Sequence, residues 1–196
     1  GRDLPMDQNR ILAEKTALWA GQGLPVVGID LAGAESANPL TDPAQLEEMA
    51  ELYALAGPKI GRTVHCGETR IVDLETFKKT LTALKANRVG HPLVTARAYW
   101  ENGDPSGLEF LVENNIVAEL CVVSNLLTGA VESPEVYGKL LKLFDEFGVK
   151  YTFSTDAPAL QKTTLASELQ LLLAHGAATP GPGPPAPEPR GFSGYS

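Results

Sequence analysis

Short apolar runs alternate along the chain with longer segments that are apolar on one face only. Residues 25–31 and 116–124 are apolar at nearly every position, which is typical of strands buried on both faces of a parallel sheet. Apolar positions three or four residues apart predict the helices between the strands. We expect strands at residues 25–31, 62–65, 88–91, 116–124 and 149–155. We expect helices at residues 6–20, 43–56, 73–86, 105–115, 134–147 and 164–175.

The ends of the expected helices carry local signals. Thr41 or Asp42 can cap the second helix, and Ser133 can cap the fifth. Thr163 or Thr164 can start the last helix. Strand ends recur about every 30 residues, which is the length of one strand-helix unit. Five such units, joined by crossovers, predict an α/β fold with a parallel sheet of about five strands.

Polar side chains that can carry out chemistry follow the ends of these strands. In a (β/α) barrel, the carboxyl ends of the strands form the active-site face. A single histidine at a strand end is usually a structural residue. Only the recurrence of polar residues at several strand ends indicates a function. Several such groups at the same end of successive strands favour a functional site. They are His65, Glu68, His91, Ser124, Asn125 and Asp156.

Composition narrows the classes of partner. The formal net charge of −8 argues against a nucleic-acid backbone and against an acidic membrane surface as partner. We expect no membrane span, because no apolar run reaches about 20 residues, and no signal peptide. Cys66 and Cys121 lie in apolar runs, so we expect two buried, reduced thiols in a cytoplasmic protein. Neither a dinucleotide-binding nor a P-loop glycine motif follows an expected strand.

Residues 180–196 differ from the rest of the chain because they are rich in proline and glycine. Such a segment buries too little apolar surface to offset its chain entropy, so we expect a disordered extension. A proline-rich ligand for another domain is the alternative. The expected folded domain is therefore residues 1–179.

An imidazole and a carboxylate at one strand mouth suit a divalent metal such as zinc, and a second histidine and a glutamate can move protons. That set performs hydrolysis. Five motifs that carry these residues, in this order, resemble the adenosine deaminase family. They are Val-Val-Gly-Ile-Asp-Leu-Ala-Gly (26–33), His-Cys-Gly-Glu-Thr (65–69), Arg-Val-Gly-His (88–91), Glu-Leu-Cys-Val-Val-Ser-Asn (119–125) and Ser-Thr-Asp-Ala-Pro (154–158).

The resemblance implies a zinc-dependent TIM barrel that replaces the 6-amino group of a purine nucleoside with oxygen. It implies that His65 and Asp156 are metal ligands. It also implies that Glu68 protonates the purine ring and that His91 orients the attacking water. Gly33 would offer its backbone N–H to the purine, because a residue without Cβ allows that approach.

This sequence departs from the family pattern at three points. Ala157 stands where the family has an acid that contacts the purine, so a modified adenine nucleoside fits better than adenosine itself. Pro92 replaces the glycine that usually follows the site histidine. The family's first strand supplies a His-x-His metal-binding pair, which this sequence lacks. His175 lies at a helix end, where we expect it to interact with the helix dipole.

A complete TIM barrel needs eight units and about 250 residues, so we expect an incomplete barrel. Self-association, or a segment that supplies the absent strands, would complete it. Two other functions stay open. One is a catalytically silent barrel or nucleoside-binding fragment, which would not hold stoichiometric zinc. The other is a metal-dependent hydrolase of an ester or lactone, which would release no ammonia.

Overall fold

A computed structural model describes residues 1–38 and 40–175, and its centre is one parallel β-sheet. The strands lie in chain order, and each neighbouring pair runs parallel. The predicted five-stranded parallel sheet is therefore confirmed. The strands are β1 (Gly28–Leu31), β2 (Gly61–His65), β3 (Arg88–Gly90), β4 (Val117–Leu120) and β5 (Tyr151–Phe153).

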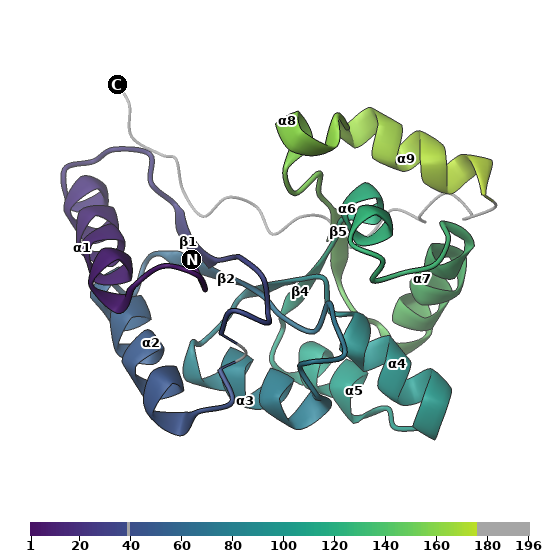
Figure 1. Ribbon diagram of the computed structural model, residues 1–196, viewed down its shortest axis with the longest axis horizontal. Coiled ribbons are helices and arrows are strands. Elements are labelled where there is room, and N and C mark those ends of the chain that lie inside the picture. The colour runs from purple at the N-terminus through teal and green to yellow at the C-terminus, as the bar shows by residue number, and fades with distance from the viewer. Residues whose placement is uncertain (39, 176–196) are drawn as a thin grey trace.

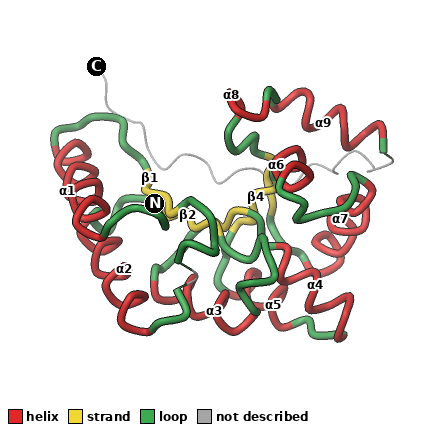
Figure 2. The backbone as a smooth tube through the Cα atoms, in the orientation of Figure 1, coloured by secondary structure: helices red, strands yellow, loops and turns green. Residues whose placement is uncertain are grey.

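Helices connect the strands and cover one side of the sheet. Helices α1, α2, α3, α5 and α7 follow one another in an arc around the strands, whereas α6, α8 and α9 gather beyond β5 (Figures 1 and 2). This is part of the outer ring of a (β/α) barrel. The helices are α1 (Met6–Gly21), α2 (Pro43–Leu55), α3 (Leu74–Ala83), α4 (Leu93–Asn102), α5 (Ser106–Glu113), α6 (Val122–Leu127), α7 (Glu135–Phe147), α8 (Pro158–Gln161) and α9 (Leu165–Ala174).

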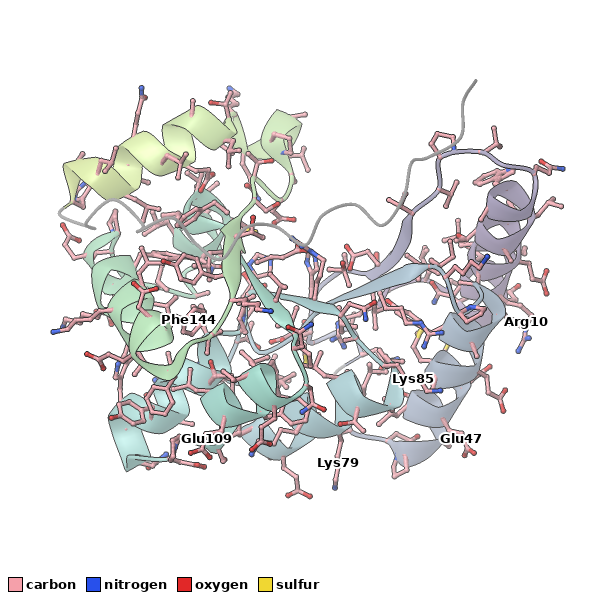
Figure 3. All side chains as sticks on the ribbon, turned by 180° about the vertical axis from the view of Figure 1, so that it is seen from behind. Arg10, Glu47, Lys79, Lys85, Glu109 and Phe144 are labelled. Atoms are coloured by element: carbon pink, nitrogen blue, oxygen red, sulfur yellow. The ribbon has the colours of Figure 1, made fainter. Side chains whose placement is uncertain are left out.

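The core lies between the sheet and this arc of helices. Val64 and Val89 of the strands are fully buried, as are Phe77 of α3 and Phe144 of α7. Charged residues of the same helices point outward, and Figure 3 shows Phe144 inside the fold while Lys79 extends away from it. Burial of this apolar surface is the main force that holds helices and sheet together.

Several helix ends follow the predicted signals. The Asp42 side chain accepts a hydrogen bond from the Ala44 N–H at the start of α2. Thr164 and Ser167 form a capping box at the start of α9. Helix α7 differs from the prediction: Pro134 takes the N-cap position, so the backbone N–H groups of the first turn receive no side-chain cap from Ser133.

The predicted strand at residues 116–124 is wrong in its second half. Strand β4 ends at Leu120, and helix α6 begins at Val122. A buried carboxylate decides this, because Glu168 of α9 accepts a hydrogen bond of 3.0 Å from the Val123 N–H at the start of the helix. β-Branched residues favoured a strand locally, and this tertiary contact overrides them.

The other differences concern the length and burial of elements. Strands β1 and β5 are shorter than predicted, and helix α4 was not predicted at all. Residues 25–31 were expected to be buried on both faces. Strand β1 instead lies at an edge of the sheet, so Val27 just before it is 70% exposed. Residues 180–196, predicted as a disordered extension, lie outside the described residues.

Candidate active site

The carboxyl ends of β2, β3 and β5 bring three side chains together. His65 ends β2, His91 follows β3, and Asp156 follows β5. One possible ligand atom from each lies within 4.8 Å of the other two. The two imidazole rings meet edge to face, with their centroids 5.0 Å apart. Two imidazoles and one carboxylate are a donor set that catalytic zinc sites use.

His91 is held by a buried chain of hydrogen bonds. Its Nδ1 lies 2.6 Å from Oδ1 of Asn125, whose Nδ2 donates to the hydroxyl of Tyr137. That hydroxyl in turn donates to the carbonyl of Cys121. Burial raises the pKa of Tyr137, so the hydroxyl stays protonated and can donate. With Asn125 as acceptor, Nδ1 of His91 carries the proton and Nε2 is left for a metal or a water.

His65 is paired with Asp30 of β1, with 3.2 Å between Nε2 and Oδ2. Burial alone would lower the pKa of His65, but the hydrogen bond and charge of Asp30, with the charges of Asp156 and Glu119, raise it. The ring also depends on Gly90, because a Cβ there would lie 2.8 Å from His65 Cδ2. Gly90 precedes His91 directly, so a glycine beside a strand-end histidine was the sequence signal for this close packing.

Asp156 and His91 share an unusual backbone conformation. Their φ angles are 56° and 55°, in the left-handed region that residues with a Cβ rarely adopt. Such strain is concentrated at functional sites, where surrounding contacts must hold it in place. The hydroxyl of Ser124 donates to Asp156 Oδ2 over 2.7 Å, and Gln161 donates to the same oxygen. Burial would raise the pKa of Asp156, but these donors and the two imidazoles lower it.

Glu68 follows His65 at the same end of the sheet and is not one of the three clustered ligand residues. Its side chain is half-buried, and its Oε1 accepts a 2.8 Å hydrogen bond from the hydroxyl of Thr128. Thr128 is the last residue of the α6 turn, so the helix that replaced the predicted strand end also reaches Glu68.

Cys66 and Cys121 are free and buried, as predicted. Burial raises the pKa of each thiol to about 12, so both thiols are protonated at neutral pH. His175 lies at the C-cap of α9, the helix end where it was expected, and its Nδ1 is 2.7 Å from Glu135 Oε1.

The two predicted substrate contacts lie at the same end of the sheet, on the loops after β1 and β5. Gly33 is exposed with a φ of 114°, and a Cβ there would lie 3.3 Å from the backbone nitrogen of Arg2. The Arg2 guanidinium donates to the carbonyl of His65, so the N-terminal residues reach the strand mouth. Ala157 occupies the N-cap of α8. The roles of Gly33 and Ala157 in binding a purine stay predictions.

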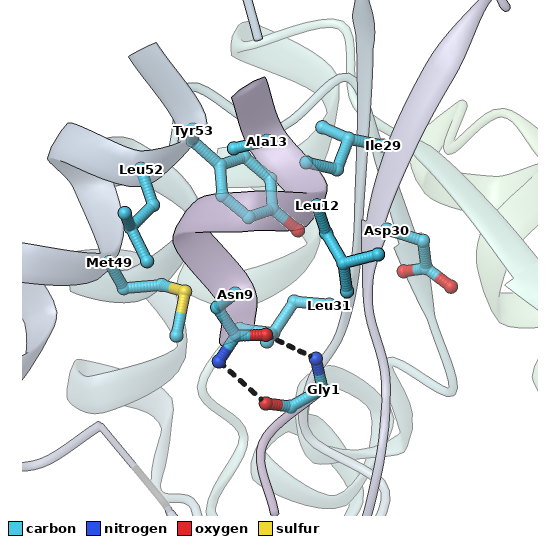
Figure 4. Close-up of a pocket in the computed structure, with 10 residues that line it drawn as sticks. All are labelled: Gly1, Asn9, Leu12, Ala13, Ile29, Asp30, Leu31, Met49, Leu52 and Tyr53. Atoms are coloured by element: carbon cyan, nitrogen blue, oxygen red, sulfur yellow. Dashed lines mark hydrogen bonds between the residues drawn. The ribbon is translucent and has the colours of Figure 1, made fainter. Parts of the chain in front are cut away.

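A small cavity of about 40 Å³ lies beside the site, between α1, α2 and β1 (Figure 4). Asp30, the partner of His65, lines it together with Asn9, which exchanges two hydrogen bonds with Gly1. Small-molecule pockets usually span about 300–1,000 Å³, so this cavity is too small for a nucleoside.

A parallel β/α sheet with this cluster at its carboxyl edge defines a barrel-type protein with a candidate metal centre. The chain belongs to the adenosine deaminase family, whose family model matches residues 5–178. It is 31% identical over 172 residues to an adenosine deaminase of Clostridium kluyveri and 32% identical over 147 residues to one of Danio rerio. Those alignments cover 88% and 75% of this chain but 44% and 38% of the relatives.

Solved structures agree on the fold. An adenine deaminase from Arthrobacter aurescens superimposes with a TM-score of 0.67 at 20% identity, over 88% of this chain and 47% of that one. The N6-methyl-AMP deaminase from Arabidopsis thaliana gives 0.62 at 22% identity, over 89% and 46%. The fold is therefore an incomplete TIM-type barrel, and the chain spans about half the length of the relatives that it matches.

Proposed function

We propose that this chain carries most of the active site of a hydrolase that deaminates adenosine or a related 6-aminopurine nucleoside. One observation carries the proposal: in a chain of the adenosine deaminase family, His65, His91 and Asp156 place their ligand atoms within 4.8 Å of one another.

We propose zinc as the metal, with His65 and Asp156 as its protein ligands in this chain. The donor set supports zinc, because neutral imidazoles and a carboxylate are its usual catalytic ligands. When bound, such a metal supplies a hydroxide nucleophile near neutral pH. A catalytic zinc takes three protein ligands as a rule, so a further ligand would come from a segment that also supplies the absent strands.

The other residues of the site move protons. Glu68 would donate a proton to the purine ring nitrogen beside the attacked carbon, while Thr128 holds one of its carboxylate oxygens. His91 would face the attacking water through Nε2, because Asn125 occupies its Nδ1. The same imidazole can take up the proton of that water.

Ala157 bears on the choice of substrate. The methyl group of Ala157 can accept no hydrogen bond from the purine edge, which favours a modified adenine nucleoside over adenosine. Among the structural neighbours, one is named an adenine deaminase and another an N6-methyl-AMP deaminase, so a deaminase of an N6-modified adenine compound shares this fold.

The experiment is a screen of purine nucleosides against the zinc-loaded protein, together with the segment that completes the barrel. Deamination shifts the ultraviolet spectrum and releases one ammonia per purine, or one amine per purine when the 6-amino group is alkylated. We expect both signals with at least one 6-aminopurine nucleoside and neither with esters or lactones. Stoichiometric zinc with no ultraviolet shift and no ammonia or amine from any 6-aminopurine nucleoside would refute the proposed function.

The second candidate function is a catalytically silent barrel that binds a nucleoside. It is favoured by the ligand count: among the described residues, His65 and Asp156 are the two proposed protein ligands, one fewer than a catalytic zinc takes as a rule. Zinc content separates the two, because turnover requires stoichiometric metal and silent binding does not.

A further inference from the structure

The structure assigns Glu35 and Arg97 to the positioning of Glu68: we propose that they hold the loop 67–69 from opposite sides and so fix the proton donor. The inference rests on the proposed role of Glu68. Neither residue was predicted from the sequence as part of the site. Glu35 lies on the loop after β1, and Arg97 lies on helix α4.

Glu35 holds the N–H groups of the loop. Its side chain is buried, with 4% of the residue exposed. Its Oε1 accepts from the N–H groups of Gly67 and Glu68, at 2.5 and 3.2 Å. Its Oε2 accepts from the Thr69 N–H at 2.8 Å and from the hydroxyl of the same residue. Three consecutive backbone donors thus converge on a single carboxylate.

Arg97 holds the carbonyl groups of the same three residues. One of its terminal nitrogens donates to Gly67 O at 2.8 Å and to Thr69 O at 2.6 Å. The other donates to Glu68 O at 2.9 Å. The planar guanidinium presents several donors in a fixed geometry, which a lysine ammonium cannot reproduce.

Contacts with α4 fix the loop further. Gly67 has a φ of 87°, and a Cβ there would lie only 2.5 Å from Val94 Cγ1. The Val94 N–H also donates to Gly67 O over 2.9 Å. The first loop residue therefore has no room to shift toward α4, and its conformation suits glycine alone.

The arrangement is suited to hold a side chain in place. Hydrogen bonds to charged groups are stronger than those between neutral groups, and here six backbone groups make them. Catalytic groups must be held to within about half an ångström of their working position. Glu68 is the middle residue of the clamped loop, and its side chain leaves the loop toward Thr128. Among the described residues, the side-chain hydrogen bonds of Glu35 and Arg97 all go to this loop, so we assign them a positioning role.

The test uses Arg97→Lys and Glu35→Gln in the full 196-residue chain, with Arg70→Lys and Glu101→Gln as matched controls. Arg70 and Glu101 form an exposed ion pair beside the same loop. Hydrogen exchange of the amides of residues 67–69 reports how firmly the loop backbone is held. The ¹³C carboxyl resonance of Glu68, assigned with Glu68→Gln, reports the environment of the Glu68 carboxylate. Neither measurement requires turnover.

We expect Arg97→Lys and Glu35→Gln each to speed amide exchange at residues 67–69 by at least about tenfold. We expect them to move the Glu68 carboxyl resonance toward that of a solvated glutamate. The controls should change neither signal. Should Glu35→Gln or Arg97→Lys fail to fold, Thr69→Val keeps both charged side chains. It removes the hydroxyl that donates to Glu35 and accepts from the Ile71 N–H, and it should speed exchange at the same amides by a smaller factor.

Unchanged amide exchange at residues 67–69 in both variants would overturn the proposal that Glu35 and Arg97 hold this loop. Faster exchange with an unmoved Glu68 resonance would show a loop anchor without a positioning role, which also overturns the inference. Failure of the proposed function is a separate result: a zinc-loaded, complete barrel that releases no ammonia refutes deamination, and the exchange and resonance data still decide whether the clamp fixes Glu68.

Discussion

At the scale of single residues, the candidate site divides into groups that we propose do the chemistry and groups that hold them in place. His65, His91 and Asp156 could be predicted from the sequence, because each stands at the end of a strand and such ends meet on one edge of a parallel sheet. Glu35 and Arg97 could not, because their partners are backbone groups of a remote loop. No local pattern marks a side chain whose partners are peptide groups.

Glu68→Gln tests the proton donor. In the zinc-loaded, complete enzyme we expect the metal content to stay the same and kcat to fall by about 10²–10⁴, because an amide cannot donate the proton in the same way. Glu109→Gln, on the exposed side of α5, is the matched control and should leave kcat unchanged (Figure 3). Near-normal kcat of Glu68→Gln with bound zinc would remove this residue from the role.

Ala157→Asp tests the substrate inference. A hydrogen bond restored to a buried polar atom of the ligand contributes about 1–3 kcal/mol, which corresponds to about ten- to a hundredfold in kcat/KM for adenosine. Ala157→Leu is the control, because it adds bulk without an acceptor and should bring no gain. Flat or lower adenosine kinetics for Ala157→Asp would mean that other groups already recognise the purine edge.

At the scale of elements, the hydrophobic pattern predicted the alternation of strands and helices but not every boundary. Helices such as α7 have a clear apolar face, so periodicity was sufficient. Helix α6 is apolar and partly β-branched, so its sequence matches a strand equally well, and the buried Glu168 carboxylate decides in favour of the helix. Helix α4 begins directly after Pro92, where the sequence pattern predicted no helix.

The packing of α7 against α9 gives a prediction on pH. Glu135 is exposed, and hydrogen bonds from Ser133, from its own backbone N–H and from His175 lower its pKa to about 2. An unfolded glutamate titrates near 4.3, so the carboxylate stabilises the fold above about pH 4.3 and this contribution is lost as the pH falls toward 2.

The measurement is the thermal midpoint of the wild type and of Glu135→Gln between pH 2 and pH 7. We expect the wild type to be more stable above about pH 5 and the difference to disappear near pH 2. Glu109→Gln should show no such pH-dependent difference. A gap between wild type and Glu135→Gln that persists at pH 2 would mean that the side chain contributes by packing and not by charge.

At the scale of the whole molecule, the described chain has the features of an open barrel. Strands β1 and β5 are the two edges of the sheet, and Val27, just before β1, is 70% exposed. None of the helices in residues 1–38 and 40–175 is long and apolar enough to span a membrane. An open parallel edge pairs readily with further strands, so self-association or a completing segment stays our prediction.

The sequence already indicated an incomplete barrel, because its strand-helix units can be counted. Five strand-helix units and no His-x-His pair predicted a partial barrel, and the alignment with the Clostridium kluyveri adenosine deaminase, which covers 44% of that enzyme, agrees with it. The sequence could not predict how the N-terminal residues are placed. Arg2 reaches the carbonyl of His65 through a contact between residues 63 positions apart.

The most direct test of the central claim is ammonia release from adenosine and other 6-aminopurine nucleosides, with zinc measured on the same samples by mass spectrometry. One sample is the 196-residue chain alone, and the other is this chain joined to a family segment that carries the first strands and their His-x-His pair. We expect the joined protein to hold one zinc and release ammonia, and the chain alone to bind zinc weakly and release none. Tightly held zinc with turnover in the chain alone, or no ammonia from a joined protein that holds its zinc, would contradict that claim.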